Sequence, residues 1–128
     1  MVIQQVSVFA QNKKGAVADI LRILTEADIQ ILFFSIADTE EYGFLHLLVD
    51  DTIKAERALV DNGKAAHITD VLRITLEHIP GAFYKELKKL SDAGINVEYA
   101  YGYVGEAGVA YGIVNVNDTG EAERALDV

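Results

Sequence analysis

The stretch "GAVADILRILTEADIQI", from Gly15 to Ile31, has a second version further along the chain, "GAFYKELKKLSDAGINV", from Gly81 to Val97. A second pair follows at almost the same spacing: "DDTIKAERAL" from Asp50 to Leu59, and "NDTGEAERAL" from Asn117 to Leu126. Two matched pairs in the same order indicate a tandem repeat. We therefore predict one repeat at residues 1–68 and another at residues 69–128.

The first half of each repeat reads as strand, helix and strand. Val6 and Val8 alternate with polar residues in "VIQQVSVFAQ", which is the period of a half-buried strand. The next apolar residues recur with helical spacing and predict an amphipathic helix over residues 16–27. "IQILFFSIAD" is rich in β-branched and aromatic residues and predicts a strand from Gln30 to about Ala37. The residues of the predicted helical stripe are Val17, Ile20, Leu21 and Leu24.

The second half of each repeat reads as strand, helix and strand again. "TEEYG" predicts a hairpin turn and "FLHLLVD" a returning strand. Asp51 precedes a helical run and predicts an N-cap, as does Asp118 in the second copy. "NG" at 62–63 ends the helix, and "AAHITDVLRITLEH" predicts a long strand that joins the two copies.

The predicted order is β-α-β-β-α-β, twice. This is the ferredoxin-like order, so the fold class is α+β, with antiparallel sheets and the helices on one face. Val128 aligns with Asp61, so the second copy lacks a counterpart of the last strand. Either the chain is shorter than its relatives, or an open sheet edge is left there for a strand of another subunit to fill.

Composition excludes several classes of function. The 51% hydrophobic and 24% charged residues are typical of a globular protein, with no stretch that predicts a membrane span or a signal peptide. We therefore expect a cytoplasmic protein. The net charge of −9 is spread over both halves and argues against nucleic acid as a partner. Without cysteine there is no thiolate catalysis or cysteine-ligated metal, and we expect no cofactor or metal.

Two motifs recur at matched places in both copies. A glycine closes the loop before the first helix in "NKKG" and "HIPG", and "ADIQI" and "AGINV" lead into the second strand. With the tandem ferredoxin-like order, these motifs resemble the ACT domain family of small amino-acid-binding regulatory modules, over essentially the whole chain. The resemblance implies an effector site in the crevice where two such domains pair.

The resemblance also implies which residues bind the effector. Gly15 and Gly81 would hold its carboxylate, because a glycine allows close backbone approach and the start of the helix presents free amides. Neutral side chains at the matched positions would bond its other polar groups, although the family often has Asp and Asn where this chain has Asn12 or His78 and Gln30. The expected ligand-binding residues are Asn12, Gly15, Ala16, Gln30, His78, Pro80, Gly81, Ala82 and Asn96.

Each candidate also has a structural interpretation. Gly15 and Gly81 are equally well explained as residues that end the strand and begin the helix, with no ligand bound. Tyr99, Tyr101 and Tyr103 share one strand face, where packing and ligand stacking both remain open. The glycine-rich "YGYVGEAGVAYG", residues 101–112, predicts a hairpin loop and not a phosphate cradle.

Three functions are compatible with these patterns. The first is a non-catalytic sensor that binds an amino acid, forms a homodimer and regulates a partner protein. The second is a ligand-free assembly module that forms homo-oligomers through its sheet edges. The third is an acylphosphatase-like enzyme, but its loops would need an arginine that "AQNKKG" and "EHIPG" lack. We expect a regulatory protein and not an enzyme.

Overall fold

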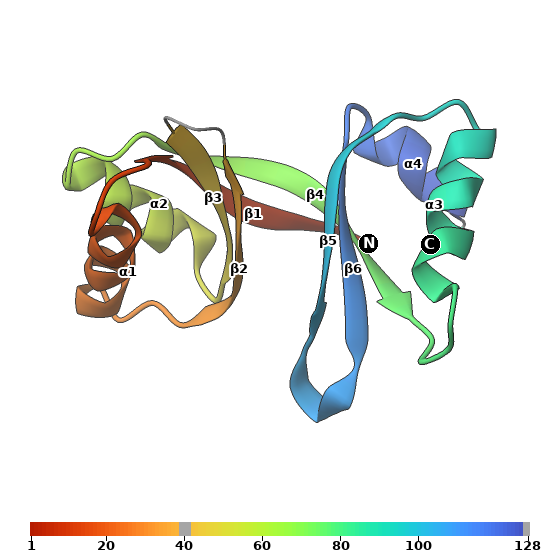
Figure 1. The fold of residues 1–128 in the computed structure, drawn as a ribbon, viewed down its shortest axis with the longest axis horizontal. Coiled ribbons are helices and arrows are strands. Elements are labelled where there is room, and N and C mark those ends of the chain that lie inside the picture. The colour runs from red at the N-terminus through yellow and green to blue at the C-terminus, as the bar shows by residue number, and fades with distance from the viewer. Residues whose placement is uncertain (39–41, 127–128) are drawn as a thin grey trace. The chain divides into compact units, whose positions relative to one another are not determined.

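The computed structural model describes residues 1–38 and 42–126, which form two compact units (Figure 1). The N-terminal unit comprises Gln4–Thr69. The C-terminal unit comprises the residues from Asp70 on together with Met1–Ile3. The first three residues of the chain thus lie in the second unit and not with the rest of the predicted repeat 1–68.

The element order confirms the predicted α+β fold. The N-terminal unit is built from β1 (Val2–Gln11), α1 (Ala16–Glu26), β2 (Ile31–Asp38), β3 (Tyr42–Val49), α2 (Thr52–Asp61) and the first part of β4 (Ala66–Leu76). The C-terminal unit is built from the rest of β4, α3 (Ala82–Asp92), β5 (Val97–Val104), a 3₁₀ turn (Glu106–Gly108), β6 (Ala110–Val116) and α4 (Thr119–Leu126). No helix among the described residues is long and apolar enough to cross a membrane.

Both units have the ferredoxin-like strand order. The strands lie in the order β2-β3-β1-β4 in the N-terminal unit and β5-β6-β4-β1 in the C-terminal unit. In each unit two helices cover one face of the sheet (Figure 1). The pairs β1–β3, β2–β3, β4–β6 and β5–β6 are all antiparallel.

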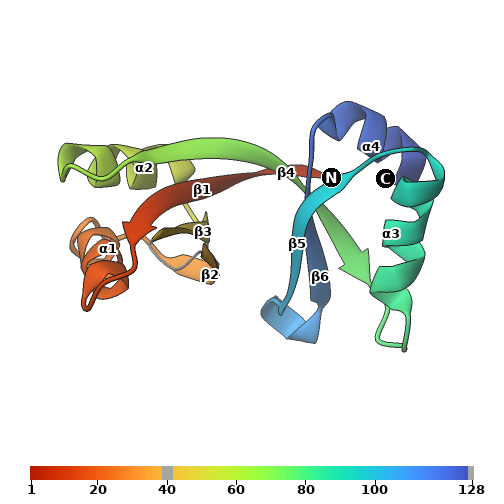
Figure 2. The same ribbon diagram turned by 45° about the horizontal axis from the view of Figure 1, so that its top comes forward.

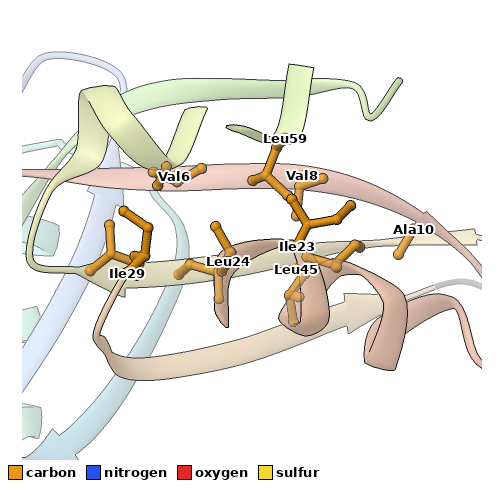
Figure 3. Packing of buried hydrophobic residues seen from close by; sticks show 12 residues of the cluster. Val6, Val8, Ala10, Ile23, Leu24, Ile29, Leu45 and Leu59 are labelled. Atoms are coloured by element: carbon orange, nitrogen blue, oxygen red, sulfur yellow. The ribbon is translucent and has the colours of Figure 1, made fainter. Parts of the chain in front are cut away.

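The helices of the N-terminal unit pack on alternate residues of its strands. Val6 and Val8 of β1 lie opposite Leu47 and Leu45 of β3, and all four are fully buried. Figure 3 shows Val6, Val8 and Leu45 of the strands gathered with Ile23 and Leu24 of α1 and Leu59 of α2. The predicted helical stripe is confirmed, since Ile20 and Leu24 are buried and Val17 and Leu21 pack against the same core.

The C-terminal unit repeats this packing on a second core. Leu72 of β4 pairs with Val114 of β6, and both pack with Leu90 of α3. Gly112 of β6 permits the close approach of Phe83, because a Cβ atom there would lie 2.8 Å from the Phe83 ring. Val2, from the start of β1, packs against this core and not against the N-terminal one.

The sequence predicted an open sheet edge beside the second repeat. That prediction is wrong, because the first residues of the chain pair with β4 along this edge. The Arg73 amide donates to the Met1 carbonyl at 2.8 Å, and the Phe9 amide donates to the Ala65 carbonyl at 2.9 Å. Strand β1 therefore runs antiparallel to β4, as Figure 2 shows, and its first residues take the place of the missing fourth strand.

Two loop predictions differ from the structure in extent. Of the hairpin turn expected at 39–43, residues 39–41 lie outside the described part of the chain, and the last two residues belong to β3. The glycine-rich loop expected at 101–112 is shorter, because β5 continues to Val104 and β6 begins at Ala110. Alternating tyrosines favour the strand there and outweigh the glycines.

Candidate functional site

Helices α1 and α3 both begin at a glycine in the left-handed region. Gly15 has φ 85° and Gly81 has φ 81°, a conformation that other residues rarely adopt. Neither helix has a side chain that accepts hydrogen bonds from its first turn. The first amide of each helix donates within its own loop, from Ala16 to the Lys13 carbonyl at 3.2 Å and from Ala82 to the Ile79 carbonyl at 3.3 Å, so the amides that follow are the candidates for a ligand.

Helices α2 and α4 begin differently. The Asp51 carboxylate accepts a hydrogen bond from the Lys54 amide at 3.0 Å, and the Asp118 carboxylate accepts one from the Glu121 amide at 3.0 Å. Both aspartates are N-caps, as predicted. The starts of α1 and α3 lack such an aspartate at the N-cap, although α1 carries Asp19 in its first turn.

A cleft of about 510 Å³ lies at the start of α1 in the N-terminal unit. Three segments form its walls: the end of β1, the loop into α1 with the first turn of that helix, and the loop between α2 and β4. This volume is within the usual range for small-molecule sites. The lining residues are Phe9, Ala10, Gln11, Lys13, Lys14, Gly15, Ala16, Asp19, Ile20, Gly63 and Lys64.

An ion pair crosses this cleft. The Lys64 ammonium lies 2.7 Å from the Asp19 carboxylate, which also lies 2.7 Å from the Arg22 guanidinium. The hydrogen bond from Lys64, followed by that from Arg22, lowers the pKa of Asp19 to about 2. Asp19 is therefore an anion held by two cations.

The matching cleft at the start of α3 is smaller and has a different charge. Its volume is about 160 Å³, and Ile79, Pro80, Gly81 and Ala82 form the loop side. The charged residues that line it are Glu77, Lys85 and Glu86. This cleft thus carries more negative than positive charge.

Comparison with protein families adds to this geometry. A family model described as "ACT domain pair" matches residues 1–128. The chain belongs to the ACT domain pair family. Membership and fold support a regulatory, ligand-binding role for this ACT domain pair.

Several solved structures share the fold of this ACT domain pair. Protein BT0572 from Bacteroides thetaiotaomicron is 33% identical, with a TM-score of 0.89, and the match covers 99% of this chain and 88% of that chain. The regulatory subunit of aspartate kinase from Thermus thermophilus, in a ligand-free form, is 18% identical, with a TM-score of 0.68 and coverage of 99% and 93%. No match was found among curated proteins.

The ACT domain pair distributes the sequence-predicted site residues over separate places. Gly15 and Ala16 line the cleft at the start of α1, and Pro80, Gly81 and Ala82 line the cleft at the start of α3. Gln30 lines a third hollow, at the other end of α1, with Asp28 and Asp50. The exposed residues Asn12, His78 and Asn96 line none of these three.

Within one unit, therefore, the glycine before the first helix does not lie near the Gln or Asn side chain that was predicted to share its site. Gly15 precedes α1 and Gln30 follows it, and Gly81 and Asn96 have the same relation to α3. The assignment of Gln30 and Asn96 to an effector site stays a prediction.

Sequence reasoning missed the charged lining of the larger cleft. Lys13 and Lys14 had a visible signal, because two lysines stand directly before the glycine in "NKKG". Lys64 and Asp19 had none, since the ion pair joins α1 to a loop from a distant part of the sequence. Only the packing of α2 beside α1 brings them together.

Proposed function

We propose that this ACT domain pair is a non-catalytic regulatory protein that binds a small carboxylate-bearing effector, an amino acid, in the cleft at the start of α1. Binding would favour one arrangement of the protein, and a partner protein would read that shift. We place this sensor in the cytoplasm as a homodimer.

The observation that carries the proposal is the contrast between helix starts. The Asp51 and Asp118 carboxylates cap α2 and α4. Helix α1 instead begins at Gly15, which has no side chain to cap it, beside a cleft of about 510 Å³ that Lys13 and Lys14 line. A carboxylate in the cleft would gain hydrogen bonds from helix amides and attraction from both lysines. The α1 cleft is the better candidate of the two, because the α3 cleft is smaller and carries two glutamates.

The structural neighbours give independent support. The Thermus thermophilus protein that shares the fold is the regulatory subunit of an amino-acid kinase, aspartate kinase. A putative regulatory domain of aspartate kinase from Porphyromonas gingivalis also shares it, at 17% identity and a TM-score of 0.55, over 99% of this chain and 94% of that one. We carry over from them only the class of role, effector-dependent regulation.

A thermal-shift screen of the standard amino acids tests this function. An effector at about 100 times its dissociation constant adds about 2.7 kcal/mol to the free energy of unfolding and raises the melting temperature. Gly15→Val should abolish the shift, because a β-branched side chain disfavours the left-handed conformation and covers the helix amides. The double variant Lys13→Gln/Lys14→Gln should weaken binding while leaving the backbone unchanged.

Gly81→Val is the matched control, since it places the same strain at the equivalent position of the other unit. It should lower the melting temperature but retain the shift with effector. A shift that survives in Gly15→Val and disappears in Gly81→Val would contradict the assignment of the site to α1.

Ligand-free assembly is the second candidate, and edge strand β2 favours it. Leu32, Phe34 and Ile36 alternate along this strand with 57%, 42% and 47% of their surfaces exposed. Apolar side chains on an edge strand are suited to pairing with another chain. If no amino acid raises the melting temperature, assembly replaces sensing as the proposed function.

A further inference from the structure

We infer that the cleft at the start of α1 takes a ligand with two separate anionic groups, a dicarboxylate or a phosphate ester with a carboxylate. This inference rests on the proposed function and deepens it, because it names the charge that the effector carries.

The first argument is the balance of charge in the cleft. Lys13, Lys14 and Lys64 line it with a single acid, Asp19, although the whole chain has a net charge of −9. Neither Lys13 nor Lys14 has an ion pair within the described part of the chain. A chain that repels anions overall thus offers a locally positive, concave site.

The second argument is that the cations belong to two separate segments of the cleft lining. Lys13 and Lys14 belong to the loop before α1, beside Gly15 and the helix amides. Lys64 belongs to the loop between α2 and β4, directly after Gly63. A ligand with one anionic group engages one wall, whereas a ligand with two engages both.

The third argument is the ion pair of Lys64 itself. Asp19 has a second partner, because the Arg22 guanidinium donates to it from Nη2 at 2.7 Å and from Nε at 3.3 Å. If Lys64 turns from Asp19 to a ligand, Asp19 keeps the pair with Arg22. Lys64 can therefore bind a ligand anion in place of Asp19 without leaving that carboxylate unpaired. Until a ligand binds, Asp19 is the ion-pair partner of the Lys64 ammonium.

The C-terminal unit provides an internal contrast. Its cleft replaces the two loop lysines with Ile79 and Pro80, and it places Glu77 and Glu86 beside Lys85. A dianion would meet net negative charge there. The inference therefore predicts one dianion site per chain.

Calorimetric titration of the full chain tests the inference with pairs of probes that differ by one anionic group. The probes are aspartate against asparagine, glutamate against glutamine, and phosphoserine against serine. The best dianion should bind about tenfold or more tightly than its neutral counterpart, as expected for a charge-assisted hydrogen bond. Added salt should reduce that preference. Aspartate or glutamate as the best probe would identify a dicarboxylate, and phosphoserine a phosphate ester.

Variants at the ion pair then locate the second anionic group. Lys64→Gln should remove most of the preference for the dianion while retaining binding of the neutral counterpart. Asp19→Asn should strengthen dianion binding, since Lys64 loses its competitor. Lys54→Gln is the matched control, because Lys54 is an exposed lysine of α2 that lies outside the cleft, and it should leave the preference unchanged.

The outcomes separate this inference from the proposed function. Equal binding of acids and amides would overturn the dianion inference and leave amino-acid sensing in place. A preference that persists in Lys64→Gln would overturn the role of Lys64. Binding of none of the probes or of the other amino acids would contradict both proposals.

Discussion

Gln5, Ser7 and His46 form a buried polar cluster that the sequence reasoning did not anticipate. All three side chains are 7% exposed or less. Ser7 Oγ lies 3.0 Å and Gln5 Nε2 lies 3.2 Å from Nδ1 of His46. The tautomer of the ring decides whether Nδ1 donates or accepts in these contacts. Burial, with a smaller contribution from His67, lowers the pKa of His46 below its ordinary value of 6.5.

This cluster predicts a loss of stability in mild acid. Since the folded state lowers the pKa of His46, the stabilisation is fully present above pH 6.5 and decreases as the pH falls below 6.5 toward the folded-state pKa. The loss is at most about 1.4 kcal/mol per pH unit. Denaturant unfolding at several values between about pH 5 and 7 measures it.

His46→Gln should flatten this pH dependence, because glutamine still forms hydrogen bonds but does not titrate. His78→Gln is the matched control, since His78 is exposed, and it should leave the slope unchanged. An unaltered slope in His46→Gln would mean that another group carries the acid sensitivity.

At the scale of elements, helices α1 and α3 end in the same way with different residues. The residue two positions after each helix is left-handed, and it is Asp28 (φ 59°) after α1 but Gly94 (φ 76°) after α3. The left-handed conformation costs a residue with a Cβ atom about 1–2 kcal/mol, and glycine avoids this cost.

We predict that Asp28→Gly stabilises the protein by about 1 kcal/mol and that Gly94→Ala destabilises it by a similar amount. The space around Gly94 is open, so the alanine would report backbone strain and no steric clash. Melting temperatures of the two variants measure both effects. Equal and small changes would show that the two helix ends are not strained in the way their dihedral angles indicate.

Periodicity predicted the elements well because each one leaves a local signal. The Val17 and Leu24 stripe and the Asp51 cap can be recognised within a single helix, and repetition in the second copy reinforces them. The larger cleft lacks such a signal, because Lys64 reaches it only through tertiary packing. The family resemblance located Gly15, but it did not reveal the cations around that glycine.

At the scale of the whole molecule, the first repeat of the sequence gives strand residues to both compact units. Strand β1 places Met1–Ile3 in the C-terminal unit and its remaining residues in the N-terminal unit. Alignment of the two copies indicated the place of a fourth strand beside β4 in the C-terminal unit. It did not show what fills that place, because pairing between β1 and β4 is a long-range contact.

Val2→Asp tests this arrangement. Val2 packs against the core of the C-terminal unit, so a carboxylate there should lower the free energy of unfolding by about 1–2 kcal/mol. Hydrogen exchange of the Arg73 amide, which donates to Met1, should also become faster. Val104→Asp makes the same substitution at a residue of β5 that is 69% exposed, and it should change neither property. Unchanged exchange at Arg73 in Val2→Asp would contradict the structural role of the N-terminal residues.

The divided C-terminal unit also imposes an order on synthesis. All residues of the N-terminal unit have been made once Thr69 is in place, so this unit has its complete set of strands early. The C-terminal unit needs β4 to β6 together with Met1–Ile3, which are synthesised before those strands. The start of the chain must therefore remain unpaired and accessible while the second half is translated, and anything that captures those three residues in the meantime would delay the second unit alone.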